Sequence, residues 1–294
     1  MQVDKQDLYI KAGAPLFFGI HGLAGRPREF SYLAKQLGKA GISTYAPILP
    51  GHGAPLDVFL KVTRKDWLDA LQGHLQQVSQ EHSPIFVGGL CWGALLALAL
   101  ALREPQMIRG LILYAPNYFY DGWNLPKPRA LTMAMAFYTP LRWFFMFATD
   151  RPPYGIKDPR LRAYIAALYR RGDQKRIFEQ LGHPRIPATT FYQMHRLRAF
   201  IRRHLQEIHT PALFLHSRED DFTSPRSSEF LCGHLGSEDK RLILLDDCYH
   251  LITVDQKKDE VFTHTLSFIQ QHMHSADHAL ATPGVKEEEE EEAP

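Results

Sequence analysis

A short glycine-rich turn between two apolar runs constrains the fold of this chain more than any other feature. The turn reads Gly-Gly-Leu-Cys-Trp-Gly over residues 88–93. The apolar run before it predicts a buried strand, and the run that continues to Leu102 predicts an apolar helix. Gly89 and Gly93 supply the small residues that a sharp strand-to-helix turn requires. The sequence therefore predicts that the Cys91 thiol is held at the end of a strand and at the N-terminus of a helix.

Short apolar runs alternate with helical patterns along much of the chain. The candidate strands are Leu16–Ile20, Ile42–Ala46, Ile85–Gly89, Ile108–Tyr114, Ala212–His216 and Leu242–Leu245. Most of these runs are continuously apolar, which is typical of parallel strands buried on both faces. The candidate helices are Glu29–Ala40, Asp66–Gln80, Trp92–Leu102, Pro225–Leu235 and Asp259–His272. Repeated β-α units predict an α/β fold with a doubly wound, mostly parallel sheet and right-handed crossovers.

One interval interrupts this alternation. From Asn117 to about Leu205 the sequence contains no clear strand, and the interval is far too long for a βα loop. We therefore expect a helical cap at 117–208, inserted before the last two strands, between core segments 1–116 and 209–274. The remaining residues, 275–294, include six consecutive glutamates and are expected to form a disordered acidic tail.

Composition limits the class of protein. The chain has 294 residues, 45% hydrophobic content and a formal net charge of +2, which fits one α/β domain with an insertion. Cys91, Cys232 and Cys248 form no disulfide framework or CxxC pair, so we expect a reducing compartment and no metal site. The first eight residues contain no apolar signal segment. Together these features predict a cytoplasmic protein without a cofactor.

Two loops after later strands supply the partners that a cysteine nucleophile needs. Such a nucleophile requires a base within hydrogen-bond reach, and the base requires an orienting acid. The expected chain order is nucleophile, acid, base, each after a strand. We therefore predict Asp220 as the acid and His250 as the base of Cys91, with Asp221 as an alternative acid.

The loop after the first candidate strand predicts an oxyanion hole, which needs two backbone N–H groups. Trp92 follows the nucleophile and should donate one of them, and Leu23 in the loop His21-Gly22-Leu23 should donate the other. We expect His21 to support this loop rather than to titrate in a reaction. His52, in Pro-Gly-His-Gly, is expected to be a structural turn residue.

These segments together resemble the α/β-hydrolase superfamily, and within it the bacterial carboxylesterase and monoacylglycerol-lipase-like group. The similar segments follow one order over roughly residues 14–272: His21-Gly22-Leu23, Pro50-Gly51-His52-Gly53, Asp66-Trp67, the turn at 88–93, Arg218 to Pro225, and His250 to Asp255. The resemblance implies a triad of Cys91, Asp220 and His250, with Leu23 and Trp92 as oxyanion donors. Most members of the family have serine where this chain has Cys91.

Sulfur changes the chemistry that the resemblance implies. A thiol at a helix N-terminus beside a histidine has a lowered pKa, and thiolate leaves more easily than alkoxide. Cys91 therefore favours thioesters or acyl transfer more than serine would. Three hypotheses follow: a hydrolase of esters or thioesters that forms an acyl-Cys intermediate, an acyltransferase that moves an acyl or aminoacyl group between thiols or to an amine or alcohol, and a non-catalytic or inactivated member of the fold.

The predicted cap has two surface features. Its apolar stretch Leu131–Phe147 predicts a lid helix that lines an acyl pocket, with an interfacial helix that touches lipid as the alternative. From Arg151 to Arg203 the chain has 13 Lys or Arg and three acidic residues, a formal charge of +10. This bias indicates either a solvated face or a docking surface for an anionic carrier protein, CoA or lipid. No motif for nucleic-acid binding is present.

Overall fold

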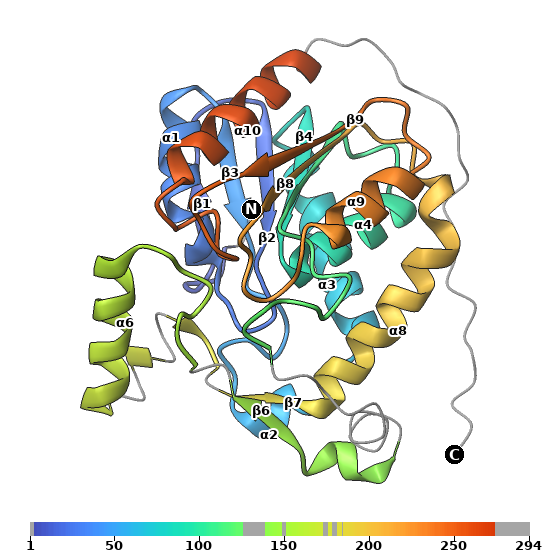
Figure 1. Ribbon diagram of the computed structural model, residues 1–294. Coiled ribbons are helices and arrows are strands. Elements are labelled where there is room, and N and C mark those ends of the chain that lie inside the picture. The colour runs from blue at the N-terminus through green and yellow to red at the C-terminus, as the bar shows by residue number, and fades with distance from the viewer. Residues whose placement is uncertain are drawn as a thin grey trace.

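A seven-stranded sheet forms the centre of the protein (Figure 1). The computed structural model describes residues 3–125, 139–148, 151–172, 176–177, 181–183 and 185–273. The strands are β1 (Leu8–Ile10), β2 (Leu16–Ile20), β3 (Ser43–Ala46), β4 (Ile85–Leu90), β5 (Gly110–Tyr114), β8 (Ala212–Ser217) and β9 (Lys240–Leu245). Their order is β1-β3-β2-β4-β5-β8-β9, and only β1 is antiparallel to its neighbour. The mostly parallel α/β sheet predicted from the sequence is confirmed, and β1 is an edge strand that the sequence pattern did not indicate.

Helices cover both faces of the sheet, as a doubly wound fold requires (Figure 1). The helices α1 (Ser31–Lys39) and α10 (Lys258–His272) pack on one face. On the other face lie α3 (Arg64–Ser79), α4 (Trp92–Arg103) and α9 (Arg226–His234). Each face has its own buried apolar cluster, so the sheet is sandwiched between two cores.

The central helix α4 explains why the glycine-rich turn is so firmly placed. Its residues from Trp92 to Leu102 are all buried, because the helix lies between the sheet on one side and further helices on the other. The neighbouring helix α3 begins at a capping box, in which Thr63 and Asp66 bond to each other's backbone N–H groups. An all-apolar helix of this kind fixes both the position and the direction of the residue that precedes it.

The cap lies between β5 and β8 at the lower edge of Figure 1. Its described elements are η2 (Pro140–Trp143), β6 (Met146–Ala148), α6 (Pro159–Arg171), β7 (Arg185–Pro187), α8 (Ala188–His204) and η3 (Leu205–Glu207). The strands β6 and β7 pair antiparallel, so the expectation of an interval without strands was wrong. Three-residue strands whose partners are distant in the sequence leave no periodic pattern to detect.

The apolar stretch Leu131–Phe147 also differs from the expected continuous lid helix. Residues 131–138 lie outside the described part of the chain, and the described remainder forms η2 and β6. Phe144 follows η2 and is 83% exposed. The predicted acidic tail at 275–294 lies outside the described residues as well. None of the helices in the described part of the chain is both long and apolar enough to span a bilayer.

Helix α8 connects the cap to the core. Its buried stripe of Thr190, Met194, Leu197 and Ile201 recurs at helical spacing and joins the apolar cluster of α3 and α4. This packing brings Phe191, one turn into α8, against the Trp92 ring, with 5.2 Å between ring centroids. The cap therefore reaches the carboxyl end of β4, where the glycine-rich turn lies.

Candidate active site

Cys91 occupies a tight turn between β4 and α4. Its backbone has φ = 60° and ψ = −114°, a conformation that non-glycine residues rarely adopt. The two flanking glycines make the turn possible, because a Cβ at Gly89 would lie 2.1 Å from the Gly93 carbonyl oxygen and one at Gly93 would lie 2.1 Å from the Ile20 carbonyl oxygen. The Cys91 N–H donates to the Tyr114 carbonyl at 2.9 Å. The partly exposed Cys91 thus sits in the strand-turn-helix position predicted for a nucleophile.

Asp220 and His250 meet in a buried pair at the ends of β8 and β9. The His250 Nδ1 donates to Asp220 Oδ2 at 2.7 Å, and both residues are 3% exposed. The other Asp220 oxygen accepts the N–H groups of Phe222 and Thr223 at 2.8 and 2.9 Å. These contacts fix the carboxylate in one orientation and hold the imidazole by one nitrogen, which leaves Nε2 for a reacting partner.

The charges in this pair shift both pKa values. Burial alone would raise the pKa of Asp220, but the charge of His250 and the hydrogen bonds from His216 and His250 bring it well below its usual range. For His250 burial alone would have the opposite effect and lower the pKa, but Asp220 and Cys91 raise it well above its ordinary value. The His250 Nε2 is buried, and the neighbouring Cys91 contributes to the raised pKa of the imidazole. A histidine of this kind can hold a proton at neutral pH.

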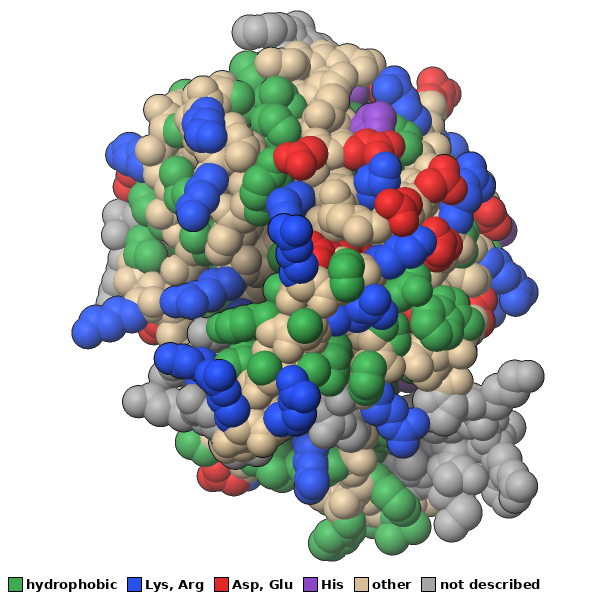
Figure 2. Space-filling view, turned by 60° about the vertical axis from the view of Figure 1, so that its left-hand side comes forward, with side chains coloured by type: hydrophobic (Ala, Val, Ile, Leu, Met, Phe, Trp, Pro, Cys, Tyr) green, Lys and Arg blue, Asp and Glu red, His purple; other side chains and the backbone are tan. Residues whose placement is uncertain are grey.

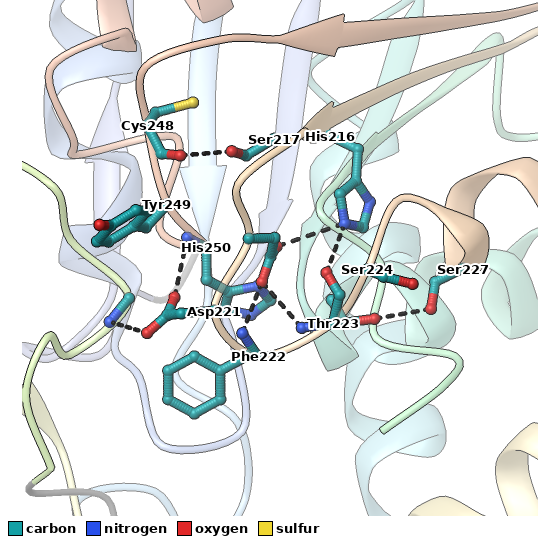
Figure 3. A network of polar contacts seen from close by, with 12 residues as sticks. His216, Ser217, Asp221, Phe222, Thr223, Ser224, Ser227, Cys248, Tyr249 and His250 are labelled. Atoms are coloured by element: carbon teal, nitrogen blue, oxygen red, sulfur yellow. Dashed lines mark hydrogen bonds and ion pairs between the residues drawn. The ribbon is translucent and has the colours of Figure 1, made fainter. Parts of the chain in front are cut away.

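Asp221, the alternative acid, contacts backbone instead of the imidazole. Its Oδ2 accepts the Gly155 N–H at 3.2 Å and its Oδ1 accepts the His250 N–H at 3.4 Å (Figure 3). It therefore ties the cap segment at Gly155 to the loop of His250. The geometry distinguishes the two neighbouring aspartates, since only Asp220 bonds to the His250 ring.

A second histidine, which the sequence pattern did not indicate, also faces Asp220. The His216 Nε2 lies 3.0 Å from the Thr223 carbonyl oxygen and 3.4 Å from Asp220 Oδ2 (Figure 3). Because the Thr223 carbonyl can only accept, Nε2 carries a proton and donates to it, while Nδ1 lies 2.7 Å from the Ser228 hydroxyl. Because His216 is the fifth residue of β8, the sequence presents it only as part of a strand.

The loop after β2 is held by hydrogen bonds to its carbonyl groups. The His21 Nδ1 donates to the Gly22 carbonyl at 2.8 Å, and its Nε2 accepts from the Leu49 N–H, so the imidazole is neutral. The His52 Nε2 donates to the Leu23 carbonyl at 2.5 Å. The Leu23 N–H makes no hydrogen bond among the described residues, and the Trp92 N–H is the first of helix α4. The structure thus leaves open the two N–H groups predicted for an oxyanion hole, and His21 supports the loop as expected.

Glu29 is a further acidic residue of the site that the sequence did not indicate. It belongs to η1 (Pro27–Phe30), directly after the loop of Leu23. Its Oε2 accepts the Gly22 N–H at 2.9 Å. The only sequence signal is its spacing of seven residues from Gly22, which no general pattern links to this contact.

Aromatic side chains form a wall beside Cys91. The Trp92 ring packs edge-on against Tyr120 and Phe191, at centroid distances of 5.6 and 5.2 Å, and Phe147 lies 4.8 Å from Phe191. Burial raises the pKa of the Tyr120 phenol well above its usual value, and the charge of Cys91 adds to the shift. An apolar wall with one phenol suits an apolar or aromatic acyl group.

The other two cysteines, Cys232 and Cys248, both have raised thiol pKa values. Burial raises the pKa of Cys248 to about 12 and also raises the pKa of Cys232, so neither thiol resembles a nucleophile. Within the described ranges, no group of three or more His, Cys, Asp or Glu side chains could hold a metal ion.

The basic residues of the cap are spread over its surface. Helix α6 has four arginines, Arg160, Arg162, Arg170 and Arg171, and no acidic residue. Figure 2 shows Lys and Arg side chains over the cap half of this face, where few acidic side chains are exposed. Helix α8 has further arginines and lies on the other side of the cap in Figure 1.

Comparison with known sequences gives one family and several relatives. Residues 14–257 match the hydrolase family described as serine aminopeptidase, S33. The chain is 25% identical over 253 residues to a thermostable monoacylglycerol lipase of Bacillus sp. (strain H-257), covering 86% of this chain and 89% of the relative. It is 21% identical over 262 residues to a carboxylesterase of Bacillus subtilis (strain 168), covering 88% and 94%.

Solved structures show the same fold. A monoacylglycerol lipase of Paleococcus ferrophilus superposes with a TM-score of 0.72 at 20% identity, covering 90% of this chain and 99% of the other. A soluble variant of the monoglyceride lipase of Saccharomyces cerevisiae gives a TM-score of 0.75 at 17% identity, covering 92% of each chain. The α/β-hydrolase fold expected from the sequence is therefore confirmed.

Proposed function

Because this chain belongs to the serine aminopeptidase S33 family of α/β hydrolases, we propose that it hydrolyses carboxylic esters or thioesters through an acyl-Cys91 intermediate. The observation that carries the proposal is the buried His250, whose Nδ1 binds Asp220 and whose raised pKa reflects the neighbouring Asp220 and Cys91. An acid, a base and a nucleophile in this relation activate the nucleophile by proton transfer. The names of the relatives, a monoacylglycerol lipase and a carboxylesterase, favour a carboxylic ester as substrate.

The acylation step follows from this arrangement. His250 Nε2 takes the proton of the Cys91 thiol, and the thiolate attacks the acyl carbon to form the new C–S bond. The carbonyl oxygen becomes an oxyanion, which the N–H groups of Leu23 and Trp92 stabilise. The tetrahedral intermediate then collapses, the bond to the leaving group breaks, and His250 returns the proton to that leaving group.

In deacylation, His250 again acts first as a base and then as an acid, with water as the attacking group. His250 takes a proton from water as the water oxygen attacks the acyl-Cys91 carbonyl, the C–S bond breaks, and His250 returns the proton to sulfur. In the tetrahedral intermediate formed from an oxygen ester, the Cys91 thiolate leaves more easily than the substrate alkoxide, so acylation depends on His250 protonating the alkoxide. In the intermediate formed from a thioester, both leaving groups are thiolates and leave with similar ease. We therefore expect faster acylation from a thioester than from an oxygen ester of the same acyl group.

Mass spectrometry of the intact protein tests the intermediate. Incubation with an activated acyl thioester should add one acyl mass, and Cys91→Ala should abolish the addition. Cys232→Ala and Cys248→Ala are matched controls that should still accept the acyl group. Cys91→Ser should shift the ratio of thioester to ester turnover toward the ester, since oxygen removes the leaving-group preference. Acylation that persists in Cys91→Ala would refute the assignment of the nucleophile.

The basic cap favours a second function, transfer of the acyl group to an anionic carrier protein or CoA. Arginines at 160, 162, 170 and 171 give α6 a positive charge that attracts an acidic partner. In this case the acyl-Cys91 adduct should resist water and discharge onto an added carrier thiol. The double change Arg170→Glu and Arg171→Glu should slow discharge onto a carrier but not onto a small neutral thiol. Arg202→Glu on α8 is the control, because it adds negative charge on the other side of the cap.

A further inference from the structure

Glu29 and Cys91 flank the same glycine from two sides. A Cβ atom added at Gly22 would lie 3.6 Å from the Cys91 Cβ and 3.6 Å from Glu29 Oε2. The carboxylate is thus close to the nucleophile, although it belongs to a different loop. Neither the family match nor the resemblance gives this residue a role, and the mechanism proposed above does not use it.

The loop that offers the Leu23 N–H closes around the Glu29 carboxylate. Gly22 donates its N–H to Glu29 Oε2 at 2.9 Å, and the Gly25 N–H closes a turn onto the Gly22 carbonyl at 3.0 Å. A Cβ at Gly25 would lie 1.8 Å from Glu29 Oε1, so a side chain at this position would displace the carboxylate from the loop. Because Leu23 lies between these two glycines, the carboxylate holds the segment that carries the oxyanion donor.

The Glu29 carboxylate also acts on the site through its charge. Burial raises the pKa of Glu29 to about 7, and the Gly22 hydrogen bond and the charge of His250 oppose that shift. By linkage, the charge of Glu29 acts on His250 in return. Among the titratable and charged groups near Glu29, Cys91 lies beside Gly22, the charge of His250 acts on the carboxylate, and Arg26 and Arg28 belong to its own segment. The charge of Arg26 also acts on His21, His52 and His183. Burial lowers the pKa of His21, His52 and His183, so these three are neutral at pH 7 and supply no positive charge to offset Glu29.

We propose that Glu29 is a positioning residue of this site, which orders the oxyanion loop through Gly22 and slows acylation of Cys91 when it is ionised. The proposal rests on the proposed acyl-Cys91 chemistry. A negative oxyanion that forms beside an ionised carboxylate is destabilised by repulsion, whereas a neutral Glu29 keeps its place in the loop without this penalty. The protonation of Glu29 thereby couples the rate of acylation to pH in the neutral range.

The test compares wild type with Glu29→Gln from pH 5.5 to pH 9. Glutamine retains an oxygen that accepts the Gly22 N–H but cannot ionise. The ratio of the Glu29→Gln acylation rate to the wild-type rate should rise by roughly tenfold between pH 6 and pH 8.5, as expected for a nearby charge in a partly buried site. A ratio that stays constant over this range would overturn the proposal.

Glu29→Ala separates the charge from the hydrogen bond. Alanine removes both, so its acylation rate at pH 6 should fall below that of Glu29→Gln by roughly tenfold, with kcat affected more than KM. Equal rates for the two variants at pH 6 would show that the Gly22 contact does not order the loop. Urea unfolding of each variant shows whether it retains the wild-type fold before these rates are compared.

Alkylation of Cys91 by iodoacetamide keeps the test independent of the proposed function. This reaction needs the thiolate but no oxyanion hole, and peptide mass spectrometry reads it at Cys91 alone. Wild type should show an inflection near pH 7 in the alkylation rate, and Glu29→Gln should lack it. If wild type forms no acyl adduct, the proposed function fails, but the pH dependence of alkylation still tests the role of Glu29. Identical pH dependences for wild type and Glu29→Gln would refute that role.

Discussion

His250 and His52 are similarly buried, but their pKa values shift in opposite directions. His250 is 3% exposed, and its pKa is raised well above the ordinary value by Asp220 and Cys91 against the effect of burial. His52 is 4% exposed, and burial lowers its pKa to about 4, although its hydrogen bonds to the carbonyl groups of Leu23 and Pro50 act in the opposite direction. Loss of water favours the neutral form in both cases, and only an anionic partner reverses that preference.

The comparison separates the histidine that we propose as the proton carrier from one that fixes backbone. His250 can change its charge during a reaction, whereas His52 remains a neutral donor that holds the oxyanion loop. Their contributions to stability also depend on pH in opposite ways. The raised pKa of His250 contributes stability that is complete below about pH 6.5 and is lost as the pH rises through the folded pKa. The lowered pKa of His52 costs stability as the pH falls below about 6.5.

Asp220→Asn should have the largest effect on this contrast. It leaves the shape of the side chain but removes the charge that raises the pKa of His250, and the amide can hold the imidazole in the wrong tautomer. We expect kcat/KM to fall by about 10,000-fold, as for comparable changes in other triads. The limb of the pH–rate profile that reports loss of the His250 proton should move to lower pH. Steady-state kinetics between pH 5 and pH 9 measure both; an unchanged limb would contradict the assignment of Asp220.

His52→Ala should have the next largest effect. It removes the hydrogen bond to the Leu23 carbonyl and loosens the loop that offers the Leu23 N–H. We expect kcat to fall by roughly tenfold to a hundredfold with little change in KM, since the loop acts on the oxyanion rather than on bound substrate. His52→Gln, which can donate to the same carbonyl, is the matched control and should recover part of the rate. Equal losses of kcat in His52→Ala and His52→Gln would show that the hydrogen bond to the Leu23 carbonyl does not order the loop.

The core of the site could be predicted from the sequence because its residues follow strands. Cys91 comes directly after the buried strand β4, and Asp220 and His250 lie in the loops that follow β8 and β9, so the topology of a parallel sheet brings them to one edge. The roles of Glu29 and His216 depend instead on side-chain packing. Glu29 matters only because its side chain binds the Gly22 N–H, and His216 only because its ring faces Asp220 and the Thr223 carbonyl.

The cap could be predicted as an insertion but not in its form. The length of the interval after β5 excluded a simple loop, whereas the pairing of β6 with β7 joins two three-residue segments that are far apart in the sequence. A stripe such as Thr190, Met194 and Leu197 predicts a buried helix face but not the helix that it contacts. Sequence patterns give the periodicity of an element, and tertiary packing decides its neighbour.

The stability of wild type and His52→Gln should diverge as the pH falls. Folded wild type resists protonation of His52 until about pH 4, whereas the unfolded chain binds that proton near pH 6.5. Wild type therefore loses up to about 3 kcal/mol from this residue between pH 6.5 and pH 4, and the glutamine variant does not. Urea unfolding at pH 7, 5.5 and 4.5 measures the difference in the free energy of unfolding. A difference that is constant with pH would mean that His52 is not held neutral.

Asp221→Asn should have the smallest effect and therefore makes the sharpest comparison with Asp220→Asn. The two aspartates are adjacent, but Asp221 accepts only the backbone N–H groups of Gly155 and His250, at 3.2 and 3.4 Å. Burial raises the pKa of Asp221, so a neutral side chain is already less costly at this position than at Asp220. Asparagine can still accept one of the two N–H groups, and we expect kcat/KM to fall by less than about tenfold with no movement of the His250 limb. A loss as large as that of Asp220→Asn, with the limb displaced, would mean that the charge on His250 is controlled through the cap segment at Gly155 rather than by the carboxylate bonded to its ring.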